Sequence, residues 1–542
     1  MLQGLSDWHK WFLCFALVFA LHAQEGREQK IQIIATANTF AAIRPIDPFS
    51  MSPSNRGWGR LSTALRAEID NNSATVLIDC GDTLLGDPMG YVLTKTRPSA
   101  LNPIIDTMND LGYMAMVPGS FDFGLGLPWL KTAERQARFT FIAANVFDSF
   151  GKEIFRPYIK TTINGVSVAF LGLYAGAGQN VGLPNVLVKD PILTAMEWVP
   201  RLRVAEGAEL VILVVHTQSA GQYATYFGNN TALRLAERVA GVDGILATQG
   251  HQQISIVHRG VPIVQPAAFG QSFTSLSYVL GRRRDRWSVR SFNPQNIAVT
   301  STHGLDPLVL QRTEQARADE TAYLNTHATT LGHDLDGRWS TVEPSLLVQL
   351  LHEVQRRVTS AQLSATPSPG AHIFIPKGAT SVRQFYALAP NEYRIARIRI
   401  TGAQLKLYLE HSARYFNFSY LPDLINPGVP LADYDMVGGC SYSLDISRPV
   451  GWRVSDLKFN NQPVLDSQTF TMAISTYRLY GGGGYMEAIG FRGEAEMISY
   501  DTIRNSLLEY VLSRPTLNVT TPTRWRTIPF IDRERVLSVY KR

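Results

Sequence analysis

The chain has 542 residues, of which 45% are hydrophobic and 18% charged, with three cysteines and a formal net charge of +6. This length allows roughly two to four domains with cores of their own, and the composition excludes both a disordered chain and a small disulfide-stapled scaffold. The net charge is small for the length and the basic residues are scattered, which argues against a binder of duplex nucleic acid.

The first residues read as a targeting segment. Residues 11–23 form a short apolar stretch that follows Lys10 and ends in small residues before a polar segment. This pattern is typical of a secretory signal peptide, here residues 1–23. The stretch is too short to cross a bilayer, and no later stretch is long enough. We therefore expect an exported protein, periplasmic or secreted, without a membrane span. Cys80 and Cys440 then remain, and their spacing leaves open whether they are bridged or free.

The first half of the chain alternates short β-branched runs with helical stretches, which is typical of an α/β sandwich. A helix-forming segment without internal Gly or Pro, residues 307–331, then suits a linker helix. The predicted strands are 31–37, 75–82, 168–174, 210–216 and 243–249, and the predicted helices include 61–69 and 103–113.

After Pro344 the pattern changes. Helical segments at 346–358 and 404–416 are interleaved with strand-like segments at 394–401 and 440–446. This change indicates a second domain, with the boundary near residues 300–345.

Three residues with metal-binding side chains follow apolar runs in the first half: Asp82, His216 and His251. Polar side chains at strand ends converge on one crevice of an α/β sheet, and a carboxylate with two imidazoles can hold a divalent transition metal. Taken singly, each residue is more simply explained as a capping Asp or a hydrogen-bonded loop His, but the set is less easily explained in this way.

Several segments carry motifs, namely 79–91 (DCGDTLLGDPMGY), 102–119, 142–146 (IAANV), 401–417, 434–454 and 476–485 (TYRLYGGGGY). In these segments the chain resembles the bacterial 5'-nucleotidase superfamily, in particular its periplasmic 2',3'-cyclic-nucleotide 2'-phosphodiesterase/3'-nucleotidase branch. The resemblance implies a four-layer α/β/β/α calcineurin-like phosphoesterase sandwich over residues 28–300. A linker helix within 301–345 would join it to a C-terminal α+β nucleotide-binding domain over 346–542.

The resemblance also implies two metal ions bridged by Asp82, which together generate hydroxide and stabilise phosphoryl transfer. Several of the family's ligands are changed in this chain. Asn38 and Phe40 stand where the family has Asp and His, and its catalytic Asn-His-Glu is contracted to Ser120, two residues before Asp122. Near His251, one His of a later pair has become Gln.

The residual ligands are therefore Asp82, His216 and His251, with Asn38 as a fourth. We expect at most one divalent ion, Mn, Zn or similar, or none, because two adjacent cations need more anionic and imidazole donors than these. The alternative is a rearranged shell that recruits His258 or His303 from other loops.

The second half of the chain keeps more of the residues that the family uses to bind its ligand. The resemblance implies that two aromatic rings hold a nucleobase by stacking. Tyr477 matches one ring, and Tyr434 is the nearest candidate for the other because the family position falls near Ala432. Residues Gly481, Gly482, Gly483 and Gly484 would let backbone approach the base closely. The simpler explanation is a Gly-rich turn with buried tyrosines.

These observations favour a pseudoenzyme, an exported superfamily member that binds nucleotides or nucleosides with weak or no phosphoesterase activity. One alternative is an active metal-dependent hydrolase of nucleotide phosphate esters. The other is a structural or surface-interaction protein that kept only the fold. The particular nucleotide, the metal and the oligomeric state are not predicted by the sequence.

Overall fold

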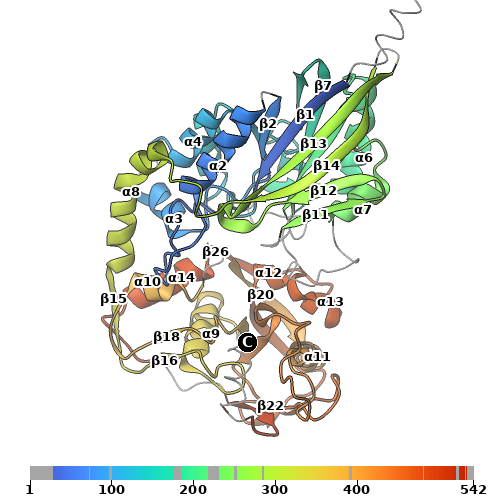
Figure 1. Cartoon of the computed structure of the whole chain (residues 1–542). Helices are drawn as coiled ribbons and strands as arrows, with labels where there is room; N and C mark the ends of the chain where they lie inside the picture. The colour runs from blue at the N-terminus through green and yellow to red at the C-terminus, as the bar shows by residue number, and fades with distance from the viewer. Residues whose placement is uncertain are drawn as a thin grey trace, which may run out of the picture.

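The computed structural model describes residues 28–72, 74–96, 100–175, 185–217, 231–248, 253–283, 286–389, 393–479, 481–519, 524–531 and 533. The predicted signal segment and the predicted ligand His251 lie outside these residues. Two lobes follow one another along the chain, an N-terminal lobe that contains β1 to β14 and a C-terminal lobe that contains β15 to β28 (Figure 1).

The N-terminal lobe is built on a pair of sheets that face each other. The first has the order β14 (Arg286–Ala298), β13 (Ser272–Arg283), β1 (Glu28–Thr36), β2 (Thr75–Asp79), β3 (Tyr113–Met116) and β4 (Thr140–Phe141). The second has the order β11 (Ile254–His258), β12 (Val261–Gln265), β10 (Gly244–Thr248), β9 (Leu210–Thr217), β7 (Val166–Ala175) and β6 (Tyr158–Ile163).

Alternation along the strands creates the layers. In β1, Ile31 and Ile33 pack with residues of the second sheet, whereas Ile34 packs on the other side against helices. The helices α2 (Trp58–Asn71), α4 (Pro103–Leu111) and α5 (Leu127–Gln136) cover the first sheet, and α6 (Pro191–Val204) and α7 (Thr231–Arg238) cover the second. This order of layers confirms the predicted α/β/β/α sandwich.

Helix α8 (Pro307–Asn325) runs along one edge of the molecule from the N-terminal to the C-terminal lobe (Figure 1). The Asp306 side chain begins it by accepting a hydrogen bond from the Leu308 amide at 2.9 Å. The helix ends earlier than residue 331, because His327–Leu331 forms strand β15, which pairs with β19 (Gly378–Ser381) and β27 (Thr516–Leu517).

The C-terminal lobe surrounds a central sheet. Its order is β21 (Asp435–Gly438), β17 (Leu363–Pro367), β25 (Thr469–Ser475), β20 (Arg394–Thr401) and β26 (Met497–Thr502). Helices α9 (Leu346–Thr359), α11 (Gly402–Ser412) and α14 (Ile503–Leu512) pack on this sheet around one large apolar core. Smaller sheets contain β16 (Leu335–Asp336) with β18 (Phe374–Ile375), and β24 (Gln462–Pro463), β23 (Val454–Phe459), β22 (Ser441–Asp445) and β28 (Trp525–Ile528).

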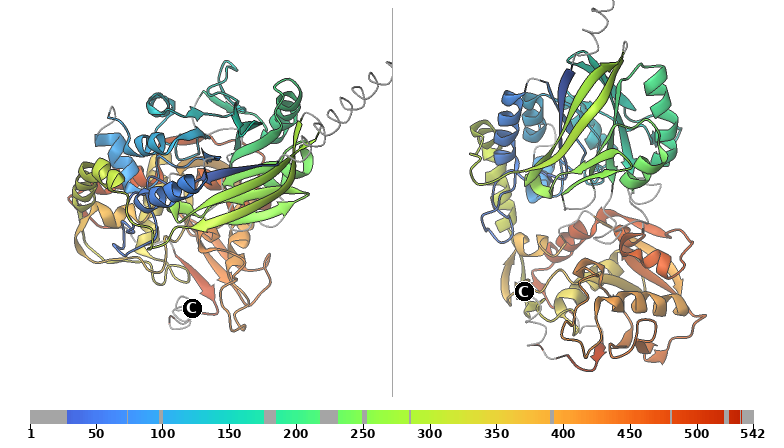
Figure 2. Two further views of the ribbon diagram at one scale, coloured as in Figure 1. Left: turned by 45° about the horizontal axis from the view of Figure 1, so that its top comes forward. Right: turned by 45° about the vertical axis from the view of Figure 1, so that its right-hand side comes forward.

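Aromatic contacts join the lobes, which lie one above the other in the right-hand view of Figure 2. Phe49 stacks on Tyr386 with ring centroids 5.8 Å apart. In the same region Tyr91 of α3 (Pro88–Thr96) stacks on Tyr323 of α8 at 5.2 Å. Tyr386 is buried and the other three rings are half-buried, so these contacts contribute to the packing between the lobes.

The cysteines answer a question that the sequence left open. Cys80 and Cys440 are both buried and unbridged, one in each lobe.

Among the described residues, no helix combines the length and the apolar character that crossing a bilayer requires.

Candidate functional site

The candidate site lies where strands of both sheets of the N-terminal lobe end. Asp79 ends β2, and Asp82 follows it in the next loop. His216 lies near the end of β9, and its ring stacks on Tyr174 of β7 with centroids 5.7 Å apart. The structure brings the predicted Asp82 and His216 together, with Oδ2 of Asp82 3.6 Å from Nε2 of His216.

Asp122 ties two loops of the site together. Its carboxylate accepts hydrogen bonds from four backbone amides, those of Gly119 and Asp82 on Oδ2 and those of Thr83 and Leu84 on Oδ1, at 2.8–3.1 Å. A carboxylate has about four lone-pair positions, so these four amides use nearly all of the hydrogen bonds that Asp122 can accept. Asp122 therefore acts as an internal anchor of the loops.

Both ring nitrogens of His216 form hydrogen bonds within the protein. Nδ1 lies 2.8 Å from the Cys80 carbonyl, so Nδ1 carries the proton. Nε2 then has the lone pair, and it accepts a hydrogen bond from the Ser120 amide at 3.2 Å. Burial lowers the pKa of His216, which agrees with a neutral ring.

Asp82 is held in the same way. Its Oδ1 accepts a hydrogen bond from the Phe121 amide at 2.7 Å. Burial raises the pKa of Asp82 to about 7, and nearby Asp79 adds to this effect by repulsion. Burial likewise raises the pKa of Asp79 to about 7, although Thr36 and Thr83 donate hydrogen bonds to it at 2.7–3.0 Å. The site is an acidic cluster in a dry environment.

Phenylalanine rings fill the position where the family places a histidine. Phe40 is 5% exposed, and its ring centroid lies 4.9 Å from Phe121 and 5.1 Å from Phe269. Asn38, the other changed position, is buried and its backbone amide donates to the Gly81 carbonyl at 2.8 Å. An apolar wall therefore takes the place of one set of metal donors.

In the part of the chain that the structure describes, which leaves out His251, the donors do not fit a two-metal centre. Among the described residues, no group of three or more His, Cys, Asp or Glu side chains is arranged to hold an ion. The imidazole lone pair and one oxygen of Asp82 already accept hydrogen bonds from loop amides. The proposed replacements lie elsewhere, since His258 pairs with Glu237 at 2.9 Å and His303 accepts from the Thr300 amide at 3.0 Å.

A second constellation lies in the C-terminal lobe, on the short helix α12 (Thr476–Leu479). Arg478 is 2% exposed and binds Asp435 with two hydrogen bonds of 2.8 and 2.9 Å. It also donates to Asp433 at 2.7 Å, and Asp433 lies 3.3 Å from the Tyr477 hydroxyl. Arg478 therefore holds the ring of Tyr477 in place through Asp433.

Two of the predicted glycines lie against the side chains of Tyr477 and Arg478. Gly481, Gly483 and Gly484 have positive φ values of 100°, 68° and 75°, which favour glycine. A Cβ on Gly482 would come within 2.5 Å of the Tyr477 ring. The glycine run thus lets the backbone lie directly against the predicted stacking ring.

Tyr434 needs a correction. It is 1% exposed, stacks on Tyr415 with centroids 4.5 Å apart and belongs to the core of the C-terminal lobe. This burial contradicts its predicted role as a stacking ring, because no face of the ring is open to a base. The neighbouring Ala432 is exposed but has only a methyl group.

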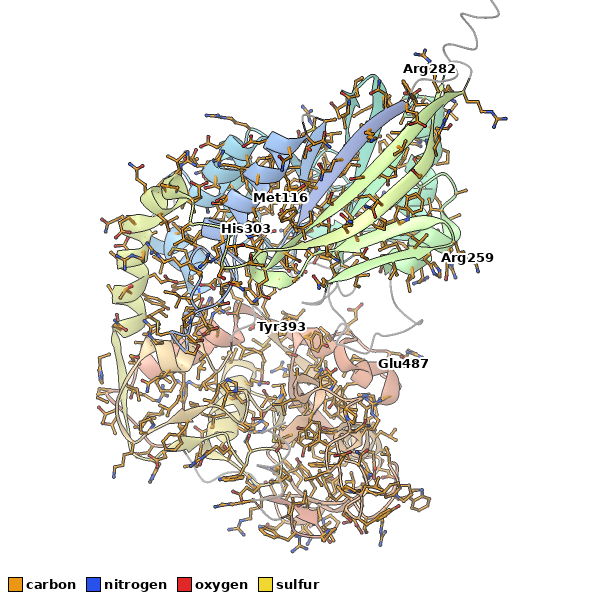
Figure 3. The ribbon with its side chains drawn as sticks, viewed as in Figure 1. Met116, Arg259, Arg282, His303, Tyr393 and Glu487 are labelled. Carbon is orange, nitrogen blue, oxygen red and sulfur yellow. The ribbon has the colours of Figure 1, made fainter. Side chains whose placement is uncertain are left out.

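Tyr393 is the functional candidate that sequence reasoning missed. Its ring stacks on Tyr477 with centroids 5.2 Å apart and planes inclined by 22°. Figure 3 shows Tyr393 on the side of the C-terminal lobe that faces the N-terminal lobe. Burial, Tyr477 and the more distant Asp82 all raise the pKa of Tyr393. The two constellations therefore face each other across the lobes.

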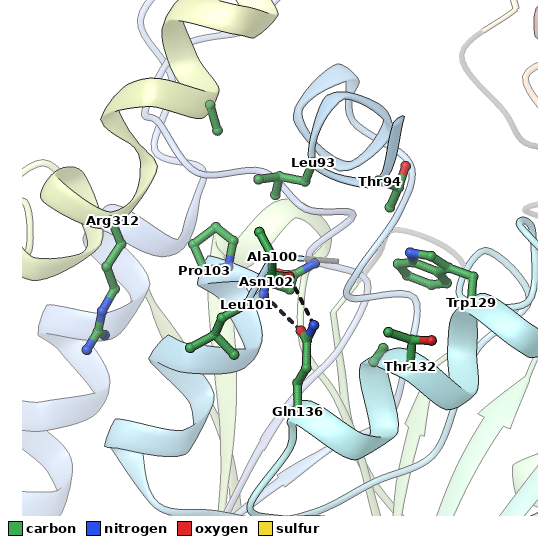
Figure 4. A pocket seen from close by; sticks show the side chains of 12 residues that line it. Leu93, Thr94, Ala100, Leu101, Asn102, Pro103, Trp129, Thr132, Gln136 and Arg312 are labelled. Atoms are coloured by element: carbon green, nitrogen blue, oxygen red, sulfur yellow. Dashed lines mark hydrogen bonds between the residues drawn. The ribbon is translucent and has the colours of Figure 1, made fainter. Parts of the chain in front are cut away.

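Two cavities lie away from these residues. The one in Figure 4, about 70 Å³, is lined by Trp129, Leu101 and Gln136 among others, and Gln136 is hydrogen-bonded to the Asn102 amide and the Ala100 carbonyl. It is far smaller than the roughly 300 Å³ that a ligand site usually has. A wider cavity of about 460 Å³ in the C-terminal lobe is lined by Arg414, Phe418 and Arg453 among others, and Tyr477 does not line it.

Comparison with known proteins agrees with this architecture. Residues 323–489 match the family of 5'-nucleotidase C-terminal domains. The trifunctional nucleotide phosphoesterase protein YfkN of Bacillus subtilis is 24% identical over 94% of this chain, and the chain spans 40% of that protein. A 2',3'-cyclic-nucleotide 2'-phosphodiesterase/3'-nucleotidase of Yersinia enterocolitica is 23% identical, over 83% of this chain and 81% of its own.

A solved structure shares the fold. It is that of a Staphylococcus aureus protein described as a 5'-nucleotidase, in complex with alpha-ketoglutarate. The TM-score is 0.75 at 19% identity, over 92% of this chain and 100% of that one.

The fold and the strand-end residues thus define a calcineurin-like phosphoesterase lobe joined to a nucleotidase C-terminal lobe. The C-terminal lobe belongs to the family of 5'-nucleotidase C-terminal domains, and over most of its length the chain is similar to nucleotidases and cyclic-nucleotide phosphodiesterases, as its motifs predicted. The calcineurin-like fold is that of metallophosphoesterases, so the poor fit of the described donors to a two-metal centre is the main departure of this chain from that fold's usual chemistry.

Proposed function

We propose that this chain is an exported nucleotide- or nucleoside-binding protein with a degenerate dimetal centre and weak or no phosphoesterase activity. The observation that carries the proposal is the hydrogen bond from the Ser120 amide to Nε2 of His216. A metal at His216 needs the same lone pair that this amide uses. At most one ion could then be held, and only after the loop that contains Ser120 has moved.

The binding part of the proposal is supported by the C-terminal lobe. Tyr477 is half-buried, whereas Arg478 beside it is fixed by two acids. An aromatic ring that is held in this way loses little conformational entropy on stacking with a base. The relatives described above are named for nucleotide substrates, which suggests the same class of ligand here.

Isothermal titration with adenosine, AMP and 3'-AMP tests the binding. We expect saturable binding that Tyr477→Ala abolishes. Tyr420→Ala is the matched control, because Tyr420 is 71% exposed on another loop. A wild-type protein that is folded and binds none of these compounds would refute the binding function.

Phosphate release tests the enzymatic alternative. We expect no release above background from 3'-AMP or 2',3'-cyclic AMP with added Mn²⁺. Efficient release that Asp82→Ala abolishes would instead establish a hydrolase with a rearranged metal shell. Export rests on residues 1–23, and the N-terminal sequence of the mature protein checks it.

A further inference from the structure

The stacked pair of Tyr393 and Tyr477 is set by the central sheet of the C-terminal lobe. Strands β20 and β25 are antiparallel, with Ile395 opposite Ser475. Tyr393 comes just before one strand and Tyr477 just after the other, so both leave the sheet at the same end. The Arg394 amide donates to the Thr476 hydroxyl at 3.1 Å, which keeps the two segments together.

No nucleobase fits between these rings. A planar base needs about 3.5 Å to each ring that stacks on it, so two sandwiching rings must be about 7 Å apart. The centroids of Tyr393 and Tyr477 are 5.2 Å apart and the planes are nearly parallel. The ring of Tyr393 therefore takes a stacking face of Tyr477 that a base would otherwise use.

The other parts of the Tyr477 side chain are also in contact with the protein and leave little room for a base. The backbone of Gly482 lies against the ring so closely that an added Cβ would come within 2.5 Å of it. The Tyr477 hydroxyl lies 3.3 Å from Asp433, which Arg478 holds in turn. Tyr477 is the fixed member of the pair.

We propose that Tyr393 is an internal competitor for the stacking face of Tyr477, so that a nucleoside binds only after the Tyr393 side chain has rotated away. This inference rests on the proposed nucleoside-binding function. Rotation of the side chain suffices, because the Ile503 amide holds the Tyr393 carbonyl at 2.7 Å and the backbone there stays in place.

The competition lowers nucleoside affinity by the free energy of the aromatic pair. Such pairs are worth enough to change a dissociation constant roughly two- to tenfold. A purine has a larger π-face than a pyrimidine, so it displaces the tyrosine more effectively. Adenosine should therefore bind more tightly than uridine, and because the competition lowers both affinities by the same factor, their ratio should stay the same when Tyr393 is removed.

The test is isothermal titration of adenosine and uridine into the full chain and three variants. Tyr393→Leu removes the competing ring and should tighten adenosine binding roughly two- to tenfold. Tyr393→Phe keeps a ring of the same size and should bind as the wild type does. Tyr477→Ala should not bind. Melting temperatures establish that each variant is folded, and Tyr393→Ser replaces the Leu variant if that one is not.

The outcomes separate this inference from the proposed function. Unchanged or weaker binding by folded Tyr393→Leu, with binding by the wild type that depends on Tyr477, overturns the competition and leaves the binding function intact. Binding by Tyr393→Leu alone supports the competition but refutes nucleoside binding as the function of the wild-type chain. Absence of binding in every folded variant overturns both.

Discussion

The Ser120 amide and the imidazole of His216 form a direct hydrogen bond, with the amide nitrogen 3.2 Å from Nε2. In a metal site this nitrogen would face an ion, and its other nitrogen would donate to a carbonyl. The second condition is met here, because Nδ1 lies 2.8 Å from the Cys80 carbonyl. The ring thus has the tautomer of a metal ligand, but the chain's own backbone takes the place of the ion.

The first prediction concerns metal dependence. Only a ligand that prefers the native state raises the melting temperature, and loop amides already use the lone pair of His216 and one oxygen of Asp82. We expect the melting temperature to change by less than about 1 °C with EDTA or with millimolar Mn²⁺ or Zn²⁺. Differential scanning calorimetry checks this, and a rise of several degrees with either ion would show that the loop opens to admit it.

The second prediction concerns Asp122. Asparagine in its place keeps one acceptor oxygen and directs an NH₂ group at amides that can only donate. Because hydrogen bonds to a charged group contribute about 1.5–3 kcal/mol each, we expect Asp122→Asn to lower the free energy of unfolding by about 2–4 kcal/mol in urea titrations.

A matched control exists for this change. Asp148 also accepts hydrogen bonds from two backbone amides, those of Phe150 and Lys152, both at 2.9 Å, but in an exposed turn. Asp148→Asn should cost less than about 1 kcal/mol, because water can replace the lost acceptor. Equal effects of the two substitutions would mean that Asp122 is not the anchor of the site.

The layers of the N-terminal lobe could be predicted from the sequence because their signal is local. The run at residues 210–216 is apolar at every position before His216, and β9 is buried on both faces. The same reasoning predicted that Asp82 and His216 lie close together, since polar residues at strand ends share one edge. Local patterns thus predicted that these two residues lie close together.

The chemistry of the site could not be predicted in this way. Nothing in the sequence shows that Asp122 accepts four amides, because the loops that donate them meet only in three dimensions. Tyr434 was assigned wrongly because an aromatic residue beside Asp435 reads equally as core or as surface. The Tyr393–Tyr477 pair follows from the register of β20 with β25. These strands are distant in the sequence, so local patterns do not predict how they pair. The only sign of the pair in the sequence is that Tyr393 comes just before one strand-like run and Tyr477 just after another.

The third prediction concerns Arg478. It lies between Asp433 and Asp435, which are both at most 5% exposed. Removing one partner of a buried ion pair leaves an uncompensated charge and costs about 3–5 kcal/mol. We therefore expect Arg478→Met to lower the free energy of unfolding by that amount, and to abolish nucleoside binding because Tyr477 loses its support.

The exposed pair of Arg399 and Glu496, at 2.7 Å, provides the comparison. Arg399→Met should cost less than about 1 kcal/mol, since such surface pairs are screened by solvent. Urea titration measures both variants. A loss below about 1 kcal/mol for Arg478→Met would show that the two acids are stable without it.

The last prediction concerns His352 on α9. It is buried, its Nδ1 lies 2.8 Å from the Ser364 hydroxyl, and burial, with a smaller effect of Arg356, lowers its pKa to about 3. The unfolded chain takes up a proton near pH 6.5, whereas the folded protein does so only near pH 3. Stability from this residue is therefore complete above pH 6.5 and is lost as the pH falls toward 3.

At pH 4.5 this difference amounts to about 2–3 kcal/mol. We expect His352→Gln to be less stable than the wild type at pH 7 but to lose less stability between pH 7 and pH 4.5, by about that amount. Urea titrations at the two pH values measure it, with His333→Gln at an exposed position as the control. If His352→Gln loses as much stability on acidification as the wild type does, another buried group governs the acid response of the C-terminal lobe.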